Sequence, residues 1–220
     1  MTGIDGYLSD VAFASTTLVI IDFEGTTPAR HPAEPIEVGA VLLQPTRDGM
    51  DCVGRYEALI RPPAHARLTD ADTRQTGITA PMLADRPPAP TVLAELDALL
   101  SDPPYMLVAH HASTEAGILR RYADACPSLA ATPMLDTVAL AKKCRPGLAS
   151  YALDALLSFY GIAIPAARHR ALADAEVTGR LLIRLLADGA RAHRWSRLAQ
   201  LRHLAGTPPP AGASTQQSLF

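Results

Sequence analysis

The apolar positions in the first third of the chain follow the pattern of β-strands. A continuous apolar and β-branched run at 17–22 (TLVIID) predicts a buried strand. The segments 35–44 (PIEVGAVLLQ) and 51–62 (DCVGRYEALIRP) predict two more strands, and 46–49 (TRDG) between them is a turn signal. Three successive strands with short connections predict a meander.

The rest of the chain alternates segments of helical periodicity with short strands. Proline-rich stretches and capping residues separate these elements. In order they are a helix from Thr91, a strand at 105–110, a helix capped by Ser113, a strand at 134–135, helices from about Asp136 and Ser150, and a helix from about Arg170 to Asp188, ended by Gly189. The whole pattern, β-β-β-α-β-α-β-α, predicts an α/β fold with a mixed sheet.

The length and composition suit one domain with short appendages. The chain has 220 residues, of which 48% are hydrophobic, enough to bury a core. We expect an N-terminal extension at 1–15, a core domain at 16–188, an Arg-rich amphipathic helix at 189–206 and a disordered tail at 207–220. From residue 189 onward the chain has arginines and no acidic residue, so the acidic excess lies in the first part.

Charge and cysteine usage exclude several classes of protein. A net charge of −2 excludes a protein that coats nucleic acid by bulk basicity, although a local basic patch stays compatible with it. The apolar runs are too short to span a bilayer, and the N-terminus lacks the pattern of a secretory signal. Three scattered cysteines are typical of a reducing compartment. We therefore expect a soluble, cytoplasmic protein with no membrane partner.

Three patches carry acidic or histidine side chains at the ends of predicted elements. Asp22 and Glu24 are two apart at the end of the first strand, so both project from one face of the sheet. Glu115 falls in the first turn of a helix, where the helix dipole alone would favour an acid. His169 and Asp174 would lie about 140° apart if both were helical. A shared site therefore needs His169 in the loop before the last helix.

Taken together, these patches resemble the motifs of the DEDDh, or DnaQ-like, exonucleases over residues 16–188. The family's first motif, Asp-x-Glu, is matched by Asp22 and Glu24, with Thr26 and Thr27 in the following loop. Its closing motif, His-x-Ala-x-x-Asp-Ala, is matched by His169, Ala171, Asp174 and Ala175. The resemblance implies a ribonuclease H-like three-layer fold with a mixed five-stranded sheet flanked by helices.

The second motif departs from the family pattern. It usually reads Ala-His-Asn-Ala-x-Phe-Asp, whereas residues 109–115 read Ala-His-His-Ala-Ser-Thr-Glu. Glu115 therefore keeps the carboxylate but moves it outward by about 1.5 Å. Magnesium tolerates little distortion of its ligand octahedron, so we expect weaker activity with magnesium than an aspartate would give. A histidine in this motif, such as His110, looks structural in the family.

The resemblance also implies a chemistry. Two divalent ions, Mg²⁺ or Mn²⁺, would be held by Asp22, Glu24, Glu115 and Asp174, with His169 as the general base. Thr26 and Thr27 would contact the substrate. The activity implied is removal of 5′-mononucleotides from single-stranded or frayed DNA 3′ ends, in proofreading or repair. A 3′-to-5′ exoribonuclease on the same fold and a catalytically weak adaptor for a polymerase or clamp are the alternatives.

The last five residues suggest a partner. Gln216, Leu219 and Phe220 resemble the peptide by which bacterial replication proteins dock on the sliding clamp, whose pattern is Gln, variable, Ser or Asp, Leu, Phe. Such peptides place their apolar anchors in a pocket at the end of a flexible linker. Gln217 departs from the leucine usual at its position, which should weaken docking. The tail therefore predicts contact with a sliding clamp, and through it with a DNA polymerase.

Overall fold

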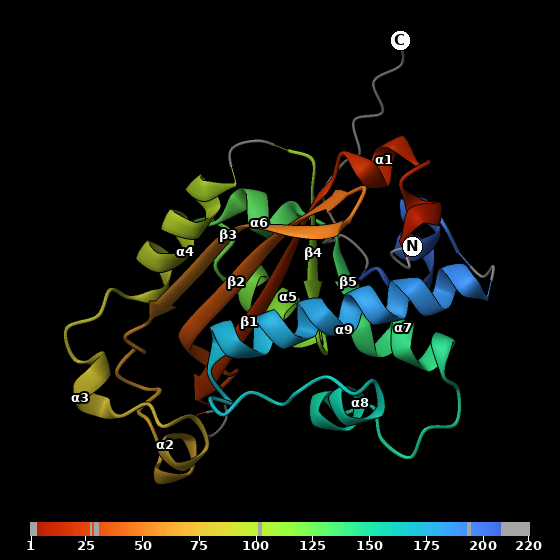
Figure 1. Ribbon diagram of the computed structural model, residues 1–220. Coiled ribbons are helices and arrows are strands. Elements are labelled where there is room, and N and C mark those ends of the chain that lie inside the picture. The colour runs from red at the N-terminus through yellow and green to blue at the C-terminus, as the bar shows by residue number, and fades with distance from the viewer. Residues whose placement is uncertain (1–3, 27, 29–30, 101–102, 193–194, 208–220) are drawn as a thin grey trace.

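The three long strands of the first third form an antiparallel meander. The computed structural model describes residues 4–26, 28, 31–100, 103–192 and 195–207 (Figure 1). β1 (Thr17–Thr26) pairs with β2 (Glu34–Thr46), and β2 pairs with β3 (Gly49–Leu59), both antiparallel. β4 (Tyr105–Ala109) and β5 (Met134–Asp136) continue the sheet from β1 in parallel. In the described chain the sheet has five strands in the order β3-β2-β1-β4-β5, which confirms the mixed sheet.

Helices cover both faces of this sheet. The helices are η1 (Asp5–Tyr7), α1 (Val11–Ala14), α2 (Asp70–Thr76), α3 (Ala80–Leu83), α4 (Ala89–Leu99), α5 (Ser113–Arg121), α6 (Pro127–Ala131), α7 (Thr137–Cys144), α8 (Leu153–Phe159), α9 (Ala171–Arg191) and α10 (Leu198–Ala205). The long helix α9 crosses one face with α7 beside it, and α4, α5 and α6 lie behind the sheet (Figure 1). The result is the three-layer fold expected for this chain.

The alternation of side chains along β1 separates the two cores. Leu18 and Ile20 belong to the cluster that contains α9, whereas Val19 and Ile21 belong to the cluster that contains α4 and α5. Successive side chains of a strand point to opposite faces. Asp22 and Glu24 continue the series of Leu18 and Ile20, so they face the same side of the sheet as α9.

The first turn of α9 packs directly against the backbone of β2. A Cβ atom built on Gly39 would stand 2.2 Å from the backbone nitrogen of Leu172, far inside van der Waals contact. Gly179, two turns further along α9, approaches the side chains of Leu43 and Ile20. Glycine at position 39 is therefore a packing requirement that holds the first turn of α9 close to the sheet.

The segments on either side of the predicted core domain pack into the same core. Ile4, Tyr7 and Phe13 are buried in the cluster that also contains Trp195 and Leu201. The C-terminal part was expected to stand outside the domain as one amphipathic helix, and the structure differs. Instead α9 continues to Arg191, Trp195 enters the core, and a separate helix α10 follows at Leu198–Ala205.

Gly189 shows why the predicted end of α9 was wrong. A glycine after an apolar periodic run usually marks a helix C-terminus. Here the helix runs through Gly189, and a Cβ atom at that position would lie 1.9 Å from the indole nitrogen of Trp195. The glycine therefore makes room for the tryptophan ring, a contact made through the tertiary fold.

Two predicted helix starts also shift. Ser113 is the first residue of α5 and makes no capping hydrogen bond, and α4 begins at Ala89, before Thr91. Asp136 does cap α7, because its carboxylate accepts a hydrogen bond from the backbone of Val138 at 2.9 Å. This cap fixes the junction between β5 and α7 beside the strands that carry the acidic residues.

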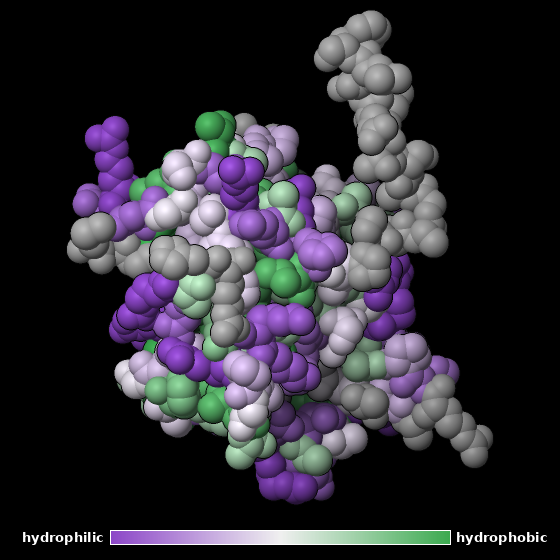
Figure 2. Space-filling model, turned by 90° about the vertical axis from the view of Figure 1, so that its right-hand side faces the viewer, coloured by the Kyte–Doolittle hydropathy of each residue, from purple (hydrophilic) through white to green (hydrophobic). Residues whose placement is uncertain are grey.

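The described surface is mixed in character. Viewed from the right-hand side of Figure 1, hydrophilic residues are interspersed with small apolar areas (Figure 2). Within the described ranges, the helices lack the combination of length and apolar character needed to cross a bilayer. Residues 208–220, with the clamp-like peptide, lie outside the described part.

Candidate active site

β1 supplies the first two carboxylates of the candidate site. The strand was predicted to end at about Asp22, but it runs to Thr26, with an irregular register between Glu24 and Gly25. Asp22 is partly buried, and Glu24 is 8% exposed. Neither acid is a freely solvated residue beyond the end of a strand.

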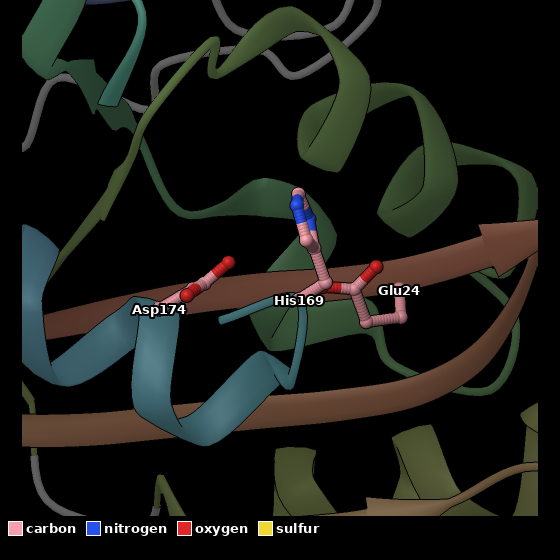
Figure 3. Close-up of side chains that lie close together, drawn as sticks. All are labelled: Glu24, His169 and Asp174. Carbon is pink, nitrogen blue, oxygen red and sulfur yellow. The ribbon is translucent and has the colours of Figure 1, made fainter. Parts of the chain in front are cut away.

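The loop before α9 and the first turn of α9 bring His169 and Asp174 to the same place. His169 precedes the helix and has a φ of 62°, in the left-handed region, as a residue of the loop. One side-chain ligand atom from each of Glu24, His169 and Asp174 lies within 4.8 Å of the others. Figure 3 shows the three side chains converging from β1, the loop and α9. The predicted position of His169 in the loop is confirmed.

Glu115 and Asp174 present buried oxygens that have no hydrogen-bond partner. Both residues are 5% exposed overall, and Glu115 Oε2 and Asp174 Oδ1 are unpaired. A buried carboxylate oxygen without a partner is costly, and the usual compensation is a proton or a cation. The donor set, carboxylates with a histidine nearby, therefore suits hard divalent cations.

The electrostatics of the cluster show how closely these groups interact. Burial raises the pKa of Asp22 well above its ordinary value, and the charges of Glu115, Glu24 and Asp174 raise it further. Burial raises the pKa of Glu24 to about 7, with Asp174 and Glu37 adding to the effect. Burial raises the pKa of Glu115 to about 8, and the charge of Asp136 adds to it. Without a cation, the cluster thus retains protons at neutral pH.

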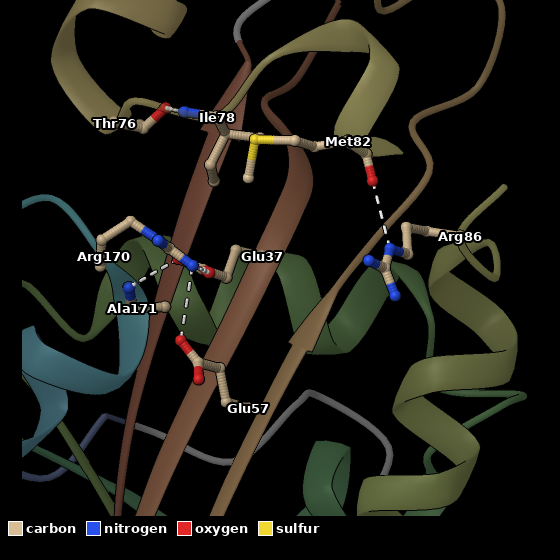
Figure 4. A network of polar contacts seen from close by, with 8 residues as sticks. All are labelled: Glu37, Glu57, Thr76, Ile78, Met82, Arg86, Arg170 and Ala171. Carbon is tan, nitrogen blue, oxygen red and sulfur yellow. Dashed lines mark hydrogen bonds and ion pairs between the residues drawn. The ribbon is translucent and has the colours of Figure 1, made fainter. Parts of the chain in front are cut away.

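Glu37 fixes the start of α9. Its side chain is fully buried and accepts hydrogen bonds from Arg170 Nε at 3.0 Å and Nη2 at 2.5 Å. Its other oxygen accepts from the backbone N–H of Ala171, the first residue of α9, at 2.9 Å. Glu57 adds a longer ion pair of 3.5 Å to Arg170 (Figure 4). The residue that follows His169 is therefore anchored to β2.

α2 borders the site on the other side of His169. The side-chain amide of Gln75 lies 3.3 Å from Nδ1 of His169, which leaves Nε2 for other contacts. The hydroxyl of Thr26 donates at 2.8 Å to Asp72, the third residue of α2, whose carboxylate takes part in the capping box with Thr69, and Thr26 is fully buried. Thr26 therefore ties α2 to β1, and Thr27 lies outside the described residues.

Arg168 joins the cluster from the same loop. Its Nη1 donates to Asp174 Oδ2, and its Nε donates to Asp154 Oδ1 of α8 at 2.5 Å. No motif or spacing in the sequence indicates this contact or the contact of Gln75 with His169. Glu37 did carry a signal, because it is a charged residue inside an otherwise apolar strand segment.

His110 has a structural role, as expected. Its Nδ1 lies 2.8 Å from Thr137 Oγ1, and its Nε2 lies 3.1 Å from the carbonyl of Tyr151. The ring is buried, and burial lowers the pKa of His110 to about 4. With both ring nitrogens engaged, His110 fastens β4 to α7 and to the segment before α8.

Comparison with known proteins places this site in a family. The model of the RNase T-type exonuclease family matches residues 19–182, which include every carboxylate of the cluster and His169. The chain belongs to this exonuclease family. A relative, the PolC-type DNA polymerase III of Thermotoga maritima, is 35% identical over 178 residues, 80% of this chain. The chain spans only 12% of the length of that relative.

Solved exonuclease structures share the fold. The nuclease domain of 3′hExo, described as a DEDDh family member bound to rAMP, has a TM-score of 0.68 at 22% identity and covers 82% of this chain and 95% of that one. Exonuclease X in complex with 5′ overhanging duplex DNA has a TM-score of 0.61 at 23% identity and covers 85% and 98%. The chain thus shares its ribonuclease H-like three-layer fold with these solved structures.

Proposed function

We propose that this exonuclease removes 5′-mononucleotides from single-stranded or frayed DNA 3′ ends in a metal-dependent reaction. The observation that carries the proposal is the convergence of Glu24, His169 and Asp174 within 4.8 Å, beside buried carboxylate oxygens that lack partners. Glu24 on β1 lies far in the sequence from the other two groups, which come from the loop before α9 and from the first turn of α9. Such convergence at the end of a central strand is typical of an active site in an α/β fold.

The carboxylates fit a pair of divalent cations. Asp22, Glu24, Glu115 and Asp174 would hold two Mg²⁺ or Mn²⁺ ions, and the unpaired oxygens of Glu115 and Asp174 support this assignment. When bound, such ions stabilise the charge that develops during in-line phosphoryl transfer. Asp22 lies between its acidic neighbours in this arrangement, since Glu115, Glu24 and Asp174 all raise its pKa.

His169 is the proposed general base. Its Nδ1 faces the amide of Gln75, so Nε2 is the nitrogen available to take a proton from the attacking water. Imidazole is the side chain that most often accepts a proton in general base catalysis. The flanking residues hold this ring in place, because Arg168 and Arg170 are each paired with carboxylates of other elements. We propose that Thr27, which follows β1 in the sequence, contacts the terminal nucleotide, whereas the buried Thr26 does not, because its hydroxyl donates to Asp72.

DNA is the preferred substrate in this proposal, and RNA is the alternative. The relative from Thermotoga maritima is named as a DNA polymerase III, and Exonuclease X was solved with duplex DNA, which supports action on DNA ends. The 3′hExo domain was solved with rAMP, which supports the alternative. Both substrates present the same phosphodiester to the carboxylates, so the sugar preference must be measured.

The test is a cleavage assay on matched oligonucleotides. Single-stranded DNA and RNA of the same sequence, labelled at the 5′ end, are incubated with Mg²⁺, with Mn²⁺ or with chelator. We expect a ladder that shortens from the 3′ end, requires metal and disappears in Asp22→Ala. The faster substrate identifies the sugar preference. A folded protein that makes no ladder with either metal would contradict the proposal and favour the adaptor alternative.

We also propose that the C-terminal peptide docks on a sliding clamp. Leu219 and Phe220 would be the apolar anchors and Gln216 the polar contact, at the end of the linker that follows α10. The test is capture of the full chain by immobilised bacterial clamp. Replacing Leu219 and Phe220 together by alanine should abolish capture, whereas replacing Gln217 by leucine should strengthen it. Equal capture of all three chains would refute docking through this peptide.

A further inference from the structure

Arg168 connects the buried carboxylate cluster with a carboxylate at the surface. Its guanidinium donates to Asp174 Oδ2 inside the site and to Asp154 Oδ1 on α8. The side chain of Asp174 is 7% exposed and that of Asp154 is 52% exposed, with Arg168 itself at 17%. Of the two carboxylates that pair with Arg168, Asp174 is therefore buried and Asp154 is in contact with solvent.

The arginine supplies positive charge to groups that would bind metal. Its charge lowers the pKa of both Asp22 and Glu24, opposing the effect of burial and of the neighbouring carboxylates. On Asp174 it occupies only Oδ2, while Oδ1 stays buried without a partner. One oxygen of the Asp174 carboxylate is thus paired with Arg168, and the other oxygen is available to a ligand.

A divalent ion bound to Asp174 would lie close to the guanidinium of Arg168. Two cations on one buried carboxylate repel each other, and the repulsion is strong where water is largely excluded. Mg²⁺ also requires a nearly ideal octahedron, which a guanidinium on the same carboxylate obstructs. Asp154 offers the arginine another position, because its exposed carboxylate can keep the guanidinium at the surface of the site.

We propose that Arg168 is a displaceable cation, which holds Asp174 in the metal-free protein and remains paired with Asp154 alone when metal binds. The inference rests on the proposed function, since it assumes that the carboxylates bind divalent ions. It assigns Arg168 a role in setting metal affinity: the arginine stabilises the metal-free fold and competes with the ion. A nuclease built in this way stays folded at low metal concentration.

The test measures metal binding directly, without substrate. Mn²⁺ is titrated calorimetrically into the full chain, into Arg168→Gln and into Arg145→Gln. Arg145 is the matched control, because it forms a similar ion pair of 2.7 Å with Asp188, about 20 Å further along α9 from Asp174. We expect Arg168→Gln to bind Mn²⁺ about tenfold more tightly, which corresponds to about 1.4 kcal/mol, and Arg145→Gln to match the unmodified chain.

Thermal unfolding adds a second readout. In chelator, Arg168→Gln should melt below the unmodified chain, because the carboxylates lose their cation. Saturating Mn²⁺ should raise the melting temperature of Arg168→Gln more than that of the unmodified chain. Equal or weaker Mn²⁺ binding by folded Arg168→Gln overturns the inference and leaves the proposed function intact. Absence of Mn²⁺ binding in the unmodified chain overturns the proposed function, and the inference with it.

A third measurement does not depend on the folding of Arg168→Gln. The side-chain Nη1–H resonance of Arg168, whose hydrogen bond goes to Asp174, can be followed by NMR in the unmodified chain and assigned by its loss in Arg168→Lys. Addition of Mg²⁺, which is diamagnetic, should shift this resonance as the guanidinium leaves Asp174. A resonance that stays in place while Mg²⁺ saturates the site overturns the inference.

Discussion

At the scale of single residues, the site depends on side chains whose neighbours constrain them tightly. His169 has a left-handed backbone, a conformation that a residue other than glycine keeps only when its surroundings enforce it. The two residues beside it supply that constraint: Arg168 is paired with Asp174 and Asp154, and Arg170 is paired with Glu37. The proposed general base is thus fixed by ion pairs of the residues on both sides of it.

Glu115 is the departure from the family's second motif that changes a carboxylate of the site. Shortening it by one methylene in Glu115→Asp restores the usual carboxylate position, so we expect a several-fold higher initial rate with Mg²⁺ and a smaller gain with Mn²⁺. The measurement is the rate of 3′-end shortening with each metal under otherwise equal conditions. Equal rates for the two proteins with both metals would show that the extra methylene has no influence on catalysis.

At the scale of secondary-structure elements, the packing of the start of α9 against β2 determines the positions of Asp174 and His169. Gly39 allows the helix backbone to approach the strand, and Glu37 binds both Arg170 and the first N–H of the helix. The helix start is therefore satisfied by a buried carboxylate of the strand in place of a capping side chain of its own. Strand and helix are positioned as one unit at the site.

The variant Glu37→Gln tests whether Glu37 holds β2 and the start of α9 together. The substitution keeps the shape of the side chain but leaves Arg170 without its buried partner, so we expect a loss of about 3 kcal/mol in the free energy of unfolding. The nuclease rate should fall as well, because the loop with His169 loosens. The matched control is Glu57→Gln, which breaks only the partly exposed pair to Arg170 and should cost less than about 1 kcal/mol. Urea denaturation of both variants measures the difference, and equal losses would contradict the assignment.

At the scale of the whole molecule, the buried carboxylates of the candidate site lower the free energy of unfolding when no metal is bound. The pKa values of Glu24 and Glu115, raised to about 7 and about 8, exceed the ordinary value of 4.5, so the folded protein binds more protons than the unfolded chain between these limits. Stability falls with rising pH wherever the folded state binds more protons. Under the proposed function, metal binding would replace those protons.

We therefore predict an inverse pH dependence in chelator. From about pH 5 to about pH 8 the free energy of unfolding should fall by an amount on the order of a few kcal/mol. Saturating Mn²⁺ should reduce or reverse this slope, because the ion binds the deprotonated carboxylates more tightly as pH rises. Thermal melts across this pH range, with and without metal, measure the effect, and Glu115→Gln should flatten the slope in chelator. Stability that rises with pH in chelator would disprove the prediction.

The local sequence determined most of the architecture. Apolar runs and turn signals predicted the meander and the α/β order, and the motifs predicted that Glu24, His169 and Asp174 would lie together. These features depend on neighbours within one turn or one strand, which is the range over which periodicity and spacing are informative. The site loop before α9 was predicted for the same reason, since His169 and Asp174 have incompatible directions on one helix.

Only the tertiary structure decided the rest. Gly189 looked like a helix end because its contact, the ring of Trp195, comes from a later segment that folds back on α9. No pattern in the sequence indicated the role of Arg168, because Asp154 and Asp174 meet its guanidinium only after α8 and α9 have packed. Contacts that depend on how the chain folds back on itself leave no periodic pattern along the sequence. The acids of the site were therefore visible in the sequence, whereas the cation that balances them was visible only in the fold.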